Sequence, residues 1–166
     1  MSRPVQISVI GRELATPETA TFAEEVGRRL AEAGAVVVCG GRGGVMEAAA
    51  RGAAEAGGVV IGILPGENPA EANTHCTYVV ASATGYARNL AVVASGDAVI
   101  AIGGEWGTLS EIAHARQFGR HVVALASWKV EPGAPIEGGE GIDVATTAAD
   151  AVQSALRAVD QTATPR

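Results

Sequence analysis

Short runs of β-branched residues alternate along this chain with longer, alanine-rich stretches of helical periodicity. This alternation is typical of a parallel sheet with helices on its faces, because parallel strands need long crossover connections. Most of the runs lack polar alternation, which indicates strands buried on both faces. The sequence therefore predicts an α/β protein with a doubly wound, mainly parallel sheet flanked by helices on both faces. The predicted strands cover residues 5–10, 35–39, 59–64, 77–81, 98–102 and 122–126, and the predicted helices cover residues 17–33, 45–56, 85–94, 109–118 and 148–158.

Local signals refine two of the predicted helices. Thr16 is a suitable N-cap for the first helix, and Pro17 fits its first position because an N–H there has no helical partner. In the third helix, the spacing of Tyr86, Leu90 and Val93 predicts that these side chains face the core.

Length and composition favour one globular unit. With 166 residues, 48 % hydrophobic and 18 % charged, the chain suffices for one domain with a large core. We expect a single nucleotide-binding domain over residues 1–160 and a flexible tail over residues 161–166. A segment rich in proline and glycine, residues 128–142, is predicted to be a mobile surface loop that includes Gly138, Gly139 and Gly141.

Charge and cysteine content disfavour several classes of function. The net charge is −6 and the basic residues are scattered, whereas a nucleic-acid-binding domain normally carries a basic stripe, so we expect no nucleic-acid partner. No apolar run reaches the roughly 18 residues of a membrane span, and no secretion signal is recognisable. Cys39 and Cys76 lack the spacing of metal ligands, which predicts reduced thiols and no metal site. We therefore expect a cytoplasmic protein.

Glycine is concentrated in two clusters, each of which follows a predicted strand and precedes a predicted helix. Residues 40–44 (GGRGG) follow the second strand, and residues 103–107 (GGEWG) follow the fifth. In an open α/β sheet such loops lie at the carboxyl ends of strands, where helix N-termini offer unpaired N–H groups to anions. Glycine can also simply permit a tight turn, but two clusters favour contact with a phosphate or nucleotide. Neither GxxxxGKS/T nor GxGxxG is present, which argues against a P-loop enzyme and an NAD site.

The two loops resemble the signatures of the LOG family, which belongs to the SLOG superfamily of Rossmann-like nucleotide-binding proteins. Residues 40–46 (GGRGGVM) are similar to the GGxxGxM loop of that family, and residues 103–111 (GGEWGTLSE) are similar to its PGGxGTxxE signature. The resemblance spans about residues 5–126 and implies a Rossmann-like fold. LOG enzymes are phosphoribohydrolases that release the base from cytokinin riboside 5′-monophosphates. The sequence is most similar to the branch that contains the molybdenum cofactor carrier protein, which binds a phosphorylated pterin.

The resemblance implies roles for particular residues. It indicates Arg88 and Glu111 as the catalytic pair, and it assigns ligand binding to Gly40, Gly41, Gly43, Gly44, Met46, Asn89, Gly103, Gly104, Trp106, Gly107 and Thr108. The residues by themselves leave other roles open. Arg88 can be a solvated helix residue or part of an intersubunit ion pair, and Glu111 can complete a capping box with Thr108 as N-cap. Met46 can belong to the core, and Trp106 can stack on a ring or pack over its own loop.

Two departures from the LOG pattern bear on function. Asn89 stands where LOG enzymes usually have a second basic residue, and Glu105 replaces the second glycine of the signature. Glu105 is expected to repel an anion unless its carboxylate points outward or binds a hydroxyl group. Three hypotheses follow: a binding protein for a phosphorylated nucleotide-like ligand, a phosphoribohydrolase of nucleoside 5′-monophosphates, and a carrier of the molybdenum cofactor.

Cofactor and partner expectations complete the sequence-based picture. Lys129, the sole lysine, lies outside the matched motifs, which argues against the lysine decarboxylase label that the family often carries, because pyridoxal phosphate chemistry needs an aldimine-forming lysine. A phosphorylated nucleotide or the molybdenum cofactor is expected as ligand, with no other cofactor required and no metal site. The resemblance further implies a homodimer or homotetramer.

Overall fold

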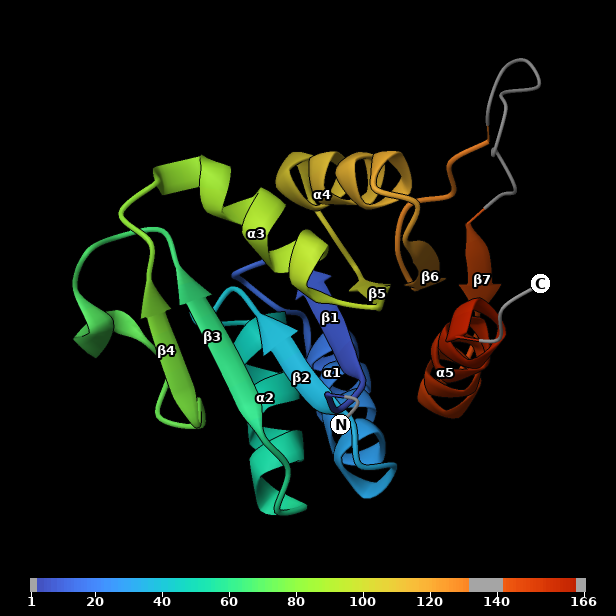
Figure 1. The fold of residues 1–166 in the computed structure, drawn as a ribbon, viewed down its shortest axis with the longest axis horizontal. Helices are drawn as coiled ribbons and strands as arrows, with labels where there is room; N and C mark the ends of the chain where they lie inside the picture. Colours follow the sequence, from blue (N-terminus) through green and yellow to red (C-terminus); the bar gives the residue numbers. More distant parts are fainter. Residues whose placement is uncertain (1–2, 132–141, 164–166) are drawn as a thin grey trace.

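The computed structural model describes residues 3–131 and 142–163. Within these ranges, seven parallel strands form one sheet in the order β4-β3-β2-β1-β5-β6-β7 (Figure 1), which confirms the predicted doubly wound α/β class. The strands are β1 (Gln6–Gly11), β2 (Val36–Cys39), β3 (Val60–Leu64), β4 (Tyr78–Ala81), β5 (Ala98–Ile102), β6 (His121–Leu125) and β7 (Asp143–Ala145). The helices are α1 (Pro17–Glu32), α2 (Val45–Glu55), α3 (Arg88–Ser95), α4 (Trp106–Gln117) and α5 (Ala148–Ala163), with short 3-10 helices η1 (Pro69–Glu71) and η2 (Gly85–Ala87).

The order of the strands reverses at β1. From β1 the chain adds β2, β3 and β4 on one side, then returns to add β5, β6 and β7 on the other. Both neighbours run parallel to β1, so that Ser8 pairs with Val38 on one side and with Val99 on the other. The carboxyl ends of these strands therefore share one edge of the sheet. The crevice at the point of reversal is the usual position for a ligand in such a fold.

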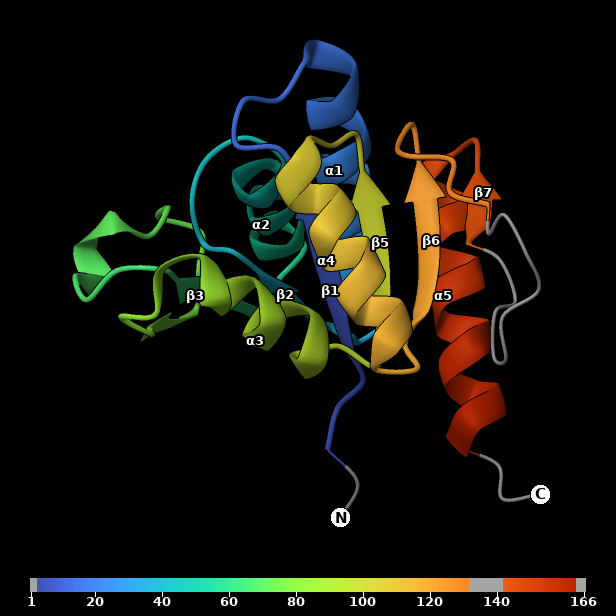
Figure 2. The ribbon, with the colours of Figure 1, turned by 90° about the horizontal axis from the view of Figure 1, so that it is seen from above.

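Helices cover both faces of the sheet. Helices α1, α2 and α5 lie on one face, whereas α3 and α4 lie on the other (Figure 1; Figure 2). Successive residues of β1 point to opposite faces, so Val9 joins the core under α1 and α2 while Ile10 joins the core under α3 and α4. Because both side chains are buried, β1 shows the apolar run without alternation from which the sequence predicted it.

The close contact between α1 and α2 depends on small residues. A Cβ atom at Gly27 would overlap the carbonyl oxygen of Ala49, and one at Gly52 would overlap the carbonyl oxygen of Glu24. Arg51 of α2 also pairs with Glu24, with 2.6 Å between Nη2 and Oε2. The small residues of both helices therefore set how closely α1 approaches α2.

The predicted strands and helices are all present, but two local predictions are wrong. Helix α4 begins at Trp106, three residues before its predicted start at position 109. Tyr86, predicted to face the core, is 96 % exposed, and Leu90 is also exposed. Helix α3 proper starts only after the 3-10 turn η2, which changes the phase of the helix. The buried residues of α3 are therefore Val92 and Val93. Val93 is thus the one predicted core residue of this helix that is buried.

The ends of other elements follow from local chemistry. Thr16 caps α1 as predicted, because its Oγ1 accepts a hydrogen bond from the N–H of Thr19 at 3.2 Å. Strand β7 was not predicted, since three residues carry too short a pattern. Residues 132–141, most of the predicted loop with its three named glycines, and residues 164–166 of the predicted tail lie outside the described residues. No described helix combines the length and the apolar character needed to cross a membrane.

Candidate functional site

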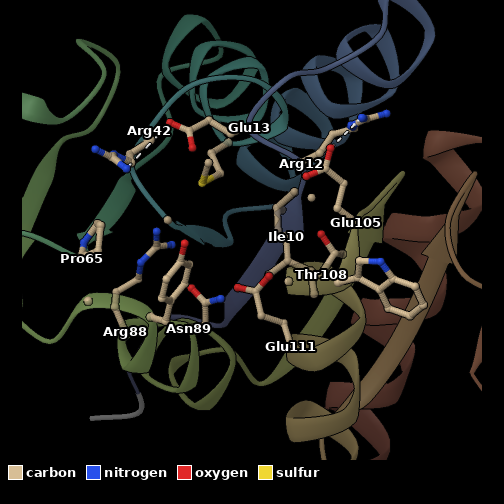
Figure 3. Close-up of a pocket in the computed structure, with 18 residues that line it drawn as sticks. Ile10, Arg12, Glu13, Arg42, Pro65, Arg88, Asn89, Glu105, Thr108 and Glu111 are labelled. Carbon is tan, nitrogen blue, oxygen red and sulfur yellow. Dashed lines mark hydrogen bonds and ion pairs between the residues drawn. The ribbon is translucent and has the colours of Figure 1, made fainter.

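A cavity of about 530 Å³, here called the pocket, lies where the order of the strands reverses. Its walls are the end of β1 with the loop that follows, the glycine loop after β2, the segment from η2 into α3, and the start of α4. Figure 3 shows charged side chains entering from opposite sides, with Glu13 and Arg42 facing Arg88 and Glu111. Two loops far apart in sequence thus meet at one site.

The pocket brings together predicted site residues from both glycine motifs. Its lining includes Gly40, Met46, Arg88, Asn89, Trp106, Gly107, Thr108 and Glu111. The remaining predicted glycines shape the loops behind it: Gly41, Gly43 and Gly44 are absent from the described lining, and Gly103 and Gly104 line a neighbouring cavity. The motif glycines therefore divide into those at the pocket surface and those that fix the course of the backbone.

The first glycine loop, residues 40–44, runs where side chains would obstruct it. A Cβ atom at Gly40 would overlap Nη1 of Arg88 and lie 2.5 Å from Sδ of Met46. Gly44, the N-cap of α2, has a φ of 65°, and a Cβ atom there would overlap the carbonyl oxygen of Glu13. The absence of side chains therefore lets the Arg88 guanidinium approach the loop and lets the loop pack on its neighbour.

Asn73 holds the first glycine loop from outside the pocket. Its backbone N–H donates to the carbonyl oxygen of Gly41 at 2.8 Å, and its Nδ2 donates to that of Arg42 at 3.0 Å. Two successive carbonyl groups are thereby satisfied and turned away from the pocket. Sequence analysis missed Asn73, because it lies in a segment without a recognisable motif.

The second glycine loop adopts a backbone conformation that favours glycine. Gly103 and Gly104 have φ values of 60° and 140°, in the region that residues with a side chain rarely adopt. The hydroxyl group of Ser127 donates to the carbonyl oxygen of Gly103. A Cβ atom at Gly104 would lie only 3.0 Å from Cβ of Thr108 and 3.1 Å from Nε1 of Trp128. Glycine is needed here to start α4 directly after β5.

Most of the charge at the pocket is paired. Arg12 Nη2 lies 2.7 Å from Oε1 of Glu105, and Arg42 Nη2 lies 3.3 Å from Oε2 of Glu71 and its Nη1 3.9 Å from Oε1 of Glu13. The expected repulsion between Glu105 and an anion is therefore offset by Arg12. Sequence analysis missed both arginines as site residues, although each lies within three residues of the end of a predicted strand at the ligand-binding edge.

Among the arginines that line the pocket, Arg88 alone forms no hydrogen bond with another described residue. It begins α3, its side chain points across the pocket toward the first glycine loop, and its buried Nε lacks a partner within the described part of the chain (Figure 3). Burial lowers the pKa of the guanidinium, while the nearby charge of Glu111 opposes this effect. The group still remains a cation at neutral pH, because an unperturbed arginine titrates far above it. A half-buried cation that forms no close ion pair with another described residue is suited to bind an anion.

Glu111 lies inside α4 and does not cap it. The helix starts at Trp106 with Glu105 as N-cap, so Thr108 is already within the first turn and the capping-box alternative is wrong. The Glu111 side chain lines the pocket and is only 6 % exposed. Burial raises its pKa to about 7, and the positive charge of Arg88 partly opposes that rise. The carboxyl group is therefore poised to exchange a proton near neutral pH.

Aromatic side chains lie at the rim of the pocket. Trp106 is 77 % exposed and packs against Trp128, with ring centroids 5.2 Å apart and planes tilted by 37°. Trp128 in turn donates from Nε1 to the carbonyl oxygen of Glu105 at 3.3 Å. Tyr86, which sequence analysis placed in the core, also lines the pocket. The rim thus offers broad aromatic faces beside the charged interior.

Metal-ligating side chains do not gather in the described part of the chain, where no group of three or more His, Cys, Asp or Glu is arranged around a common point. The polar side chains that line the pocket instead include those of arginine and glutamate and the amide of Asn89. These groups bind anions and hydrogen-bonding heterocycles.

Comparisons with known proteins agree with this architecture. A family model described as the SLOG cluster4 family matches residues 4–161. An uncharacterised protein from Archaeoglobus fulgidus is 45 % identical over 121 residues, which is 73 % of this chain and 80 % of that protein. The structure of the molybdenum cofactor binding protein from Rippkaea orientalis is similar with a TM-score of 0.85 and 30 % identity, covering 96 % of this chain and 99 % of that one.

The molybdenum cofactor carrier protein from Chlamydomonas reinhardtii is similar to the same degree. Its TM-score is 0.84 at 29 % identity, and the match covers 95 % of this chain and 99 % of that one. The superfamily resemblance that the two glycine loops predicted is therefore confirmed. Both loops lie within the matched residues, and the chain belongs to the SLOG cluster4 family.

Proposed function

We propose that this protein binds a phosphorylated small molecule with a flat heterocyclic part, and that the molybdenum cofactor, a phosphorylated pterin carried as cargo, is the ligand it takes. The observation that carries the proposal is Arg88, a half-buried cation that points into the pocket beside Gly40 of the first glycine loop. The similar structures of the molybdenum cofactor binding protein from Rippkaea orientalis and the carrier protein from Chlamydomonas reinhardtii match nearly the whole chain and support that choice of ligand. The two free cysteines fit the reducing cytoplasm, which we propose as the location.

The pocket residues fit both parts of such a ligand. The planar guanidinium of Arg88 would bind the phosphate through paired N–H donors, close to the backbone of residues 40–44. Asn89 offers an amide that both donates and accepts, as the edge of a pterin ring requires. The exposed ring of Trp106 offers a face on which a flat ring can stack. Each chemical part of the ligand thus meets a suitable side chain.

Retention of the cofactor under anaerobic conditions tests this proposal. The protein is mixed with molybdenum cofactor released from a molybdoenzyme and passed over a desalting column, and the retained cofactor is measured by reconstitution of a cofactor-free enzyme. We expect stoichiometric retention, and we expect Arg88→Gln to lower it at least about tenfold, since a charge-assisted phosphate contact contributes about 1.5–3 kcal/mol. Arg28→Gln, on α1 where Arg28 pairs with Glu32, is the matched control. No retention, or equal retention by the Arg88 variant, would refute the proposal.

A second candidate function is hydrolysis of the N-glycosidic bond of a nucleoside 5′-monophosphate. The observation that favours it is the buried Glu111 carboxyl, which lines the same pocket as Arg88 and whose pKa burial raises to about 7. Loss of the base develops positive charge at the sugar, which an ionised Glu111 would stabilise while Arg88 holds the phosphate or assists the departing base. Incubation with AMP and N6-modified AMP should then release ribose 5-phosphate, and Glu111→Gln should abolish the release. Absence of product with the parent protein would exclude this candidate for those substrates.

We also propose that two copies of the chain associate through the outer face of α3. Ala87, Leu90, Ala91 and Ala94 are exposed there, and Tyr86 continues this apolar surface to the rim of the pocket. An uncharged apolar face of this kind is typical of a self-complementary interface. Light scattering during gel filtration should show a homodimer or homotetramer, which Ala91→Glu should dissociate. Gln153→Glu adds the same charge at an exposed position of α5 and should leave the assembly intact.

A further inference from the structure

The two cysteines are distant in sequence but adjacent in the fold. Cys39 ends β2, Cys76 lies two residues before β4, and the Cys76 side chain packs against the buried core to which Cys39 belongs. Gly62 of β3 pairs with Cys39 in the sheet register, and a Cβ atom at Gly62 would lie 2.6 Å from Sγ of Cys76. The missing side chain of Gly62, the sheet neighbour of Cys39, thus provides the space that the Cys76 sulfur occupies.

The two thiols differ in environment. Cys39 is completely buried, and its interaction with the Cys76 thiol together with burial raises its pKa. Cys76 is half-buried, and its interaction with the Cys39 thiol lowers its pKa against the opposing effect of burial. Its Sγ also lies 3.6 Å from Oδ1 of Asn73. Cys76 is therefore the thiol that more readily forms a thiolate and the one that a small oxidant can reach.

The pair also lies directly behind the pocket. Cys39 is followed by Gly40, which lines the pocket beside Arg88. Asn73, which contacts Cys76, holds the next two carbonyl groups of the same loop. A covalent link between the sulfur atoms would therefore join the start of the glycine loop to the segment that supports it.

We propose that Cys39 and Cys76 form a modification site for hydroperoxides, at which the dithiol is oxidised reversibly to an intramolecular disulfide. The Cys76 thiolate attacks the terminal oxygen of the hydroperoxide, the O–O bond breaks, and the released alkoxide or hydroxide takes up a proton, leaving a sulfenic acid on Cys76. The Cys39 sulfur then loses its proton and attacks the Cys76 sulfur, and the S–O bond breaks to release water. In sum, two thiols and one hydroperoxide give a disulfide, an alcohol or water, and a further water. A dithiol reductant reverses the reaction by exchange.

Mass spectrometry of the reduced full-length protein after equimolar hydrogen peroxide tests this proposal. We expect the intact mass to fall by two hydrogen atoms, a non-reducing digest to link the peptides of Cys39 and Cys76, and dithiothreitol to restore both thiols. Amide exchange of residues 40–44 should be slower in the oxidised protein. Oxygen added to Cys76 while Cys39 stays a free thiol, disulfides between chains, or unchanged exchange in the loop would overturn the proposal.

A glycine substitution tests whether cross-linking depends on the proximity of the two thiols and not only on the presence of both cysteines. Gly62→Ala keeps both cysteines but places a methyl group 2.6 Å from the Cys76 sulfur, which must then move, so cross-linking should slow at least about tenfold, the effect of roughly 1.4 kcal/mol on the barrier. Gly66→Ala is the control, because its Cβ atom would lie 3.6 Å from the nearest atom, Oε2 of Glu71. Equal rates in the Gly62 variant and the parent would contradict the assignment. If circular dichroism shows that Gly62→Ala does not fold, the peptide map of the parent decides alone.

Discussion

Replacing the Glu111 carboxyl group with an amide should stabilise the protein at alkaline pH and change little at acid pH. Glu111 is 6 % exposed, and its pKa is about 7 in the folded protein, against 4.5 for an ordinary glutamate. Between these two values the folded protein holds a proton that the unfolded chain has released, so the free energy of unfolding falls as the pH rises through this window. Since each tenfold change in proton affinity corresponds to about 1.4 kcal/mol, the total loss above pH 7 is about 3 kcal/mol. Glu111→Gln keeps the shape of the side chain and removes this titration.

Urea denaturation of both proteins without ligand, at pH values from 5 to 9, measures the effect. The variant should be more stable than the parent by about 3 kcal/mol at pH 8–9, which corresponds to a Tm higher by about 6–12 °C for a chain of this size. At pH 5 the difference should be below about 1 kcal/mol, because most of the folded protein then carries a neutral carboxyl group. Glu67→Gln, which makes the same change at an exposed position, serves as the control.

A stability difference between Glu111→Gln and the parent that does not vary with pH would refute this reasoning. So would a variant that is less stable at every pH, because the Glu111 carboxylate would then be stabilised in the folded protein by partners stronger than Arg88. The comparison is independent of ligand identity, and it therefore tests the electrostatics of the pocket by itself.

Three further substitutions test the geometry of the pocket and of the helices. Gly40→Ala should displace the Arg88 guanidinium, which its Cβ atom would overlap, and lower cofactor retention about tenfold or more with little change of fold, as measured by desalting and circular dichroism. Arg12→Gln should leave Glu105 without its ion-pair partner and weaken anion binding, an effect that titration at low and high salt should show to be larger at low salt. Gly27→Ala should push α1 away from α2 and reduce the free energy of unfolding by about 1–3 kcal/mol in urea, whereas an unchanged value would contradict the described packing.

The extent to which the site could be predicted varies from residue to residue. Arg88 and Glu111 were found by their place in family signatures, and the fold brings them to one pocket. The alternative capping role of Glu111 is wrong, because residues 108–111 have the pattern of a helix start although the helix begins three residues before the predicted position 109. Tyr86 was assigned to the core by periodicity, yet the 3-10 turn before α3 changes the helical phase and leaves its ring exposed at the pocket rim. Asn73 carries no sequence signal at all.

The remaining differences between the sequence-based expectations and the structure arise from contacts between distant segments of the chain. Glu105 was expected to repel anions, because nothing in the sequence shows that Arg12, on another strand's loop, lies 2.7 Å away. Cys39 and Cys76 were predicted to be reduced thiols without a shared site, because their proximity depends on β3 passing between them with glycine at position 62. Such contacts depend on strand order and register, which local patterns do not specify.

The sequence by itself determined the alternation of strands and helices, the doubly wound class and the two glycine loops, because periodicity and the need for bare backbone are local properties. Only the tertiary structure decided which charges meet. The reversal of the strand order at β1 brings the loops after β1, β2 and β5 to one crevice. There Arg12 pairs with Glu105, the buried Nε of Arg88 has no hydrogen-bond partner among the described residues, and burial raises the pKa of Glu111 to about 7. These properties arise from distances between atoms of remote segments and from the exclusion of water, which exist only once the chain has folded.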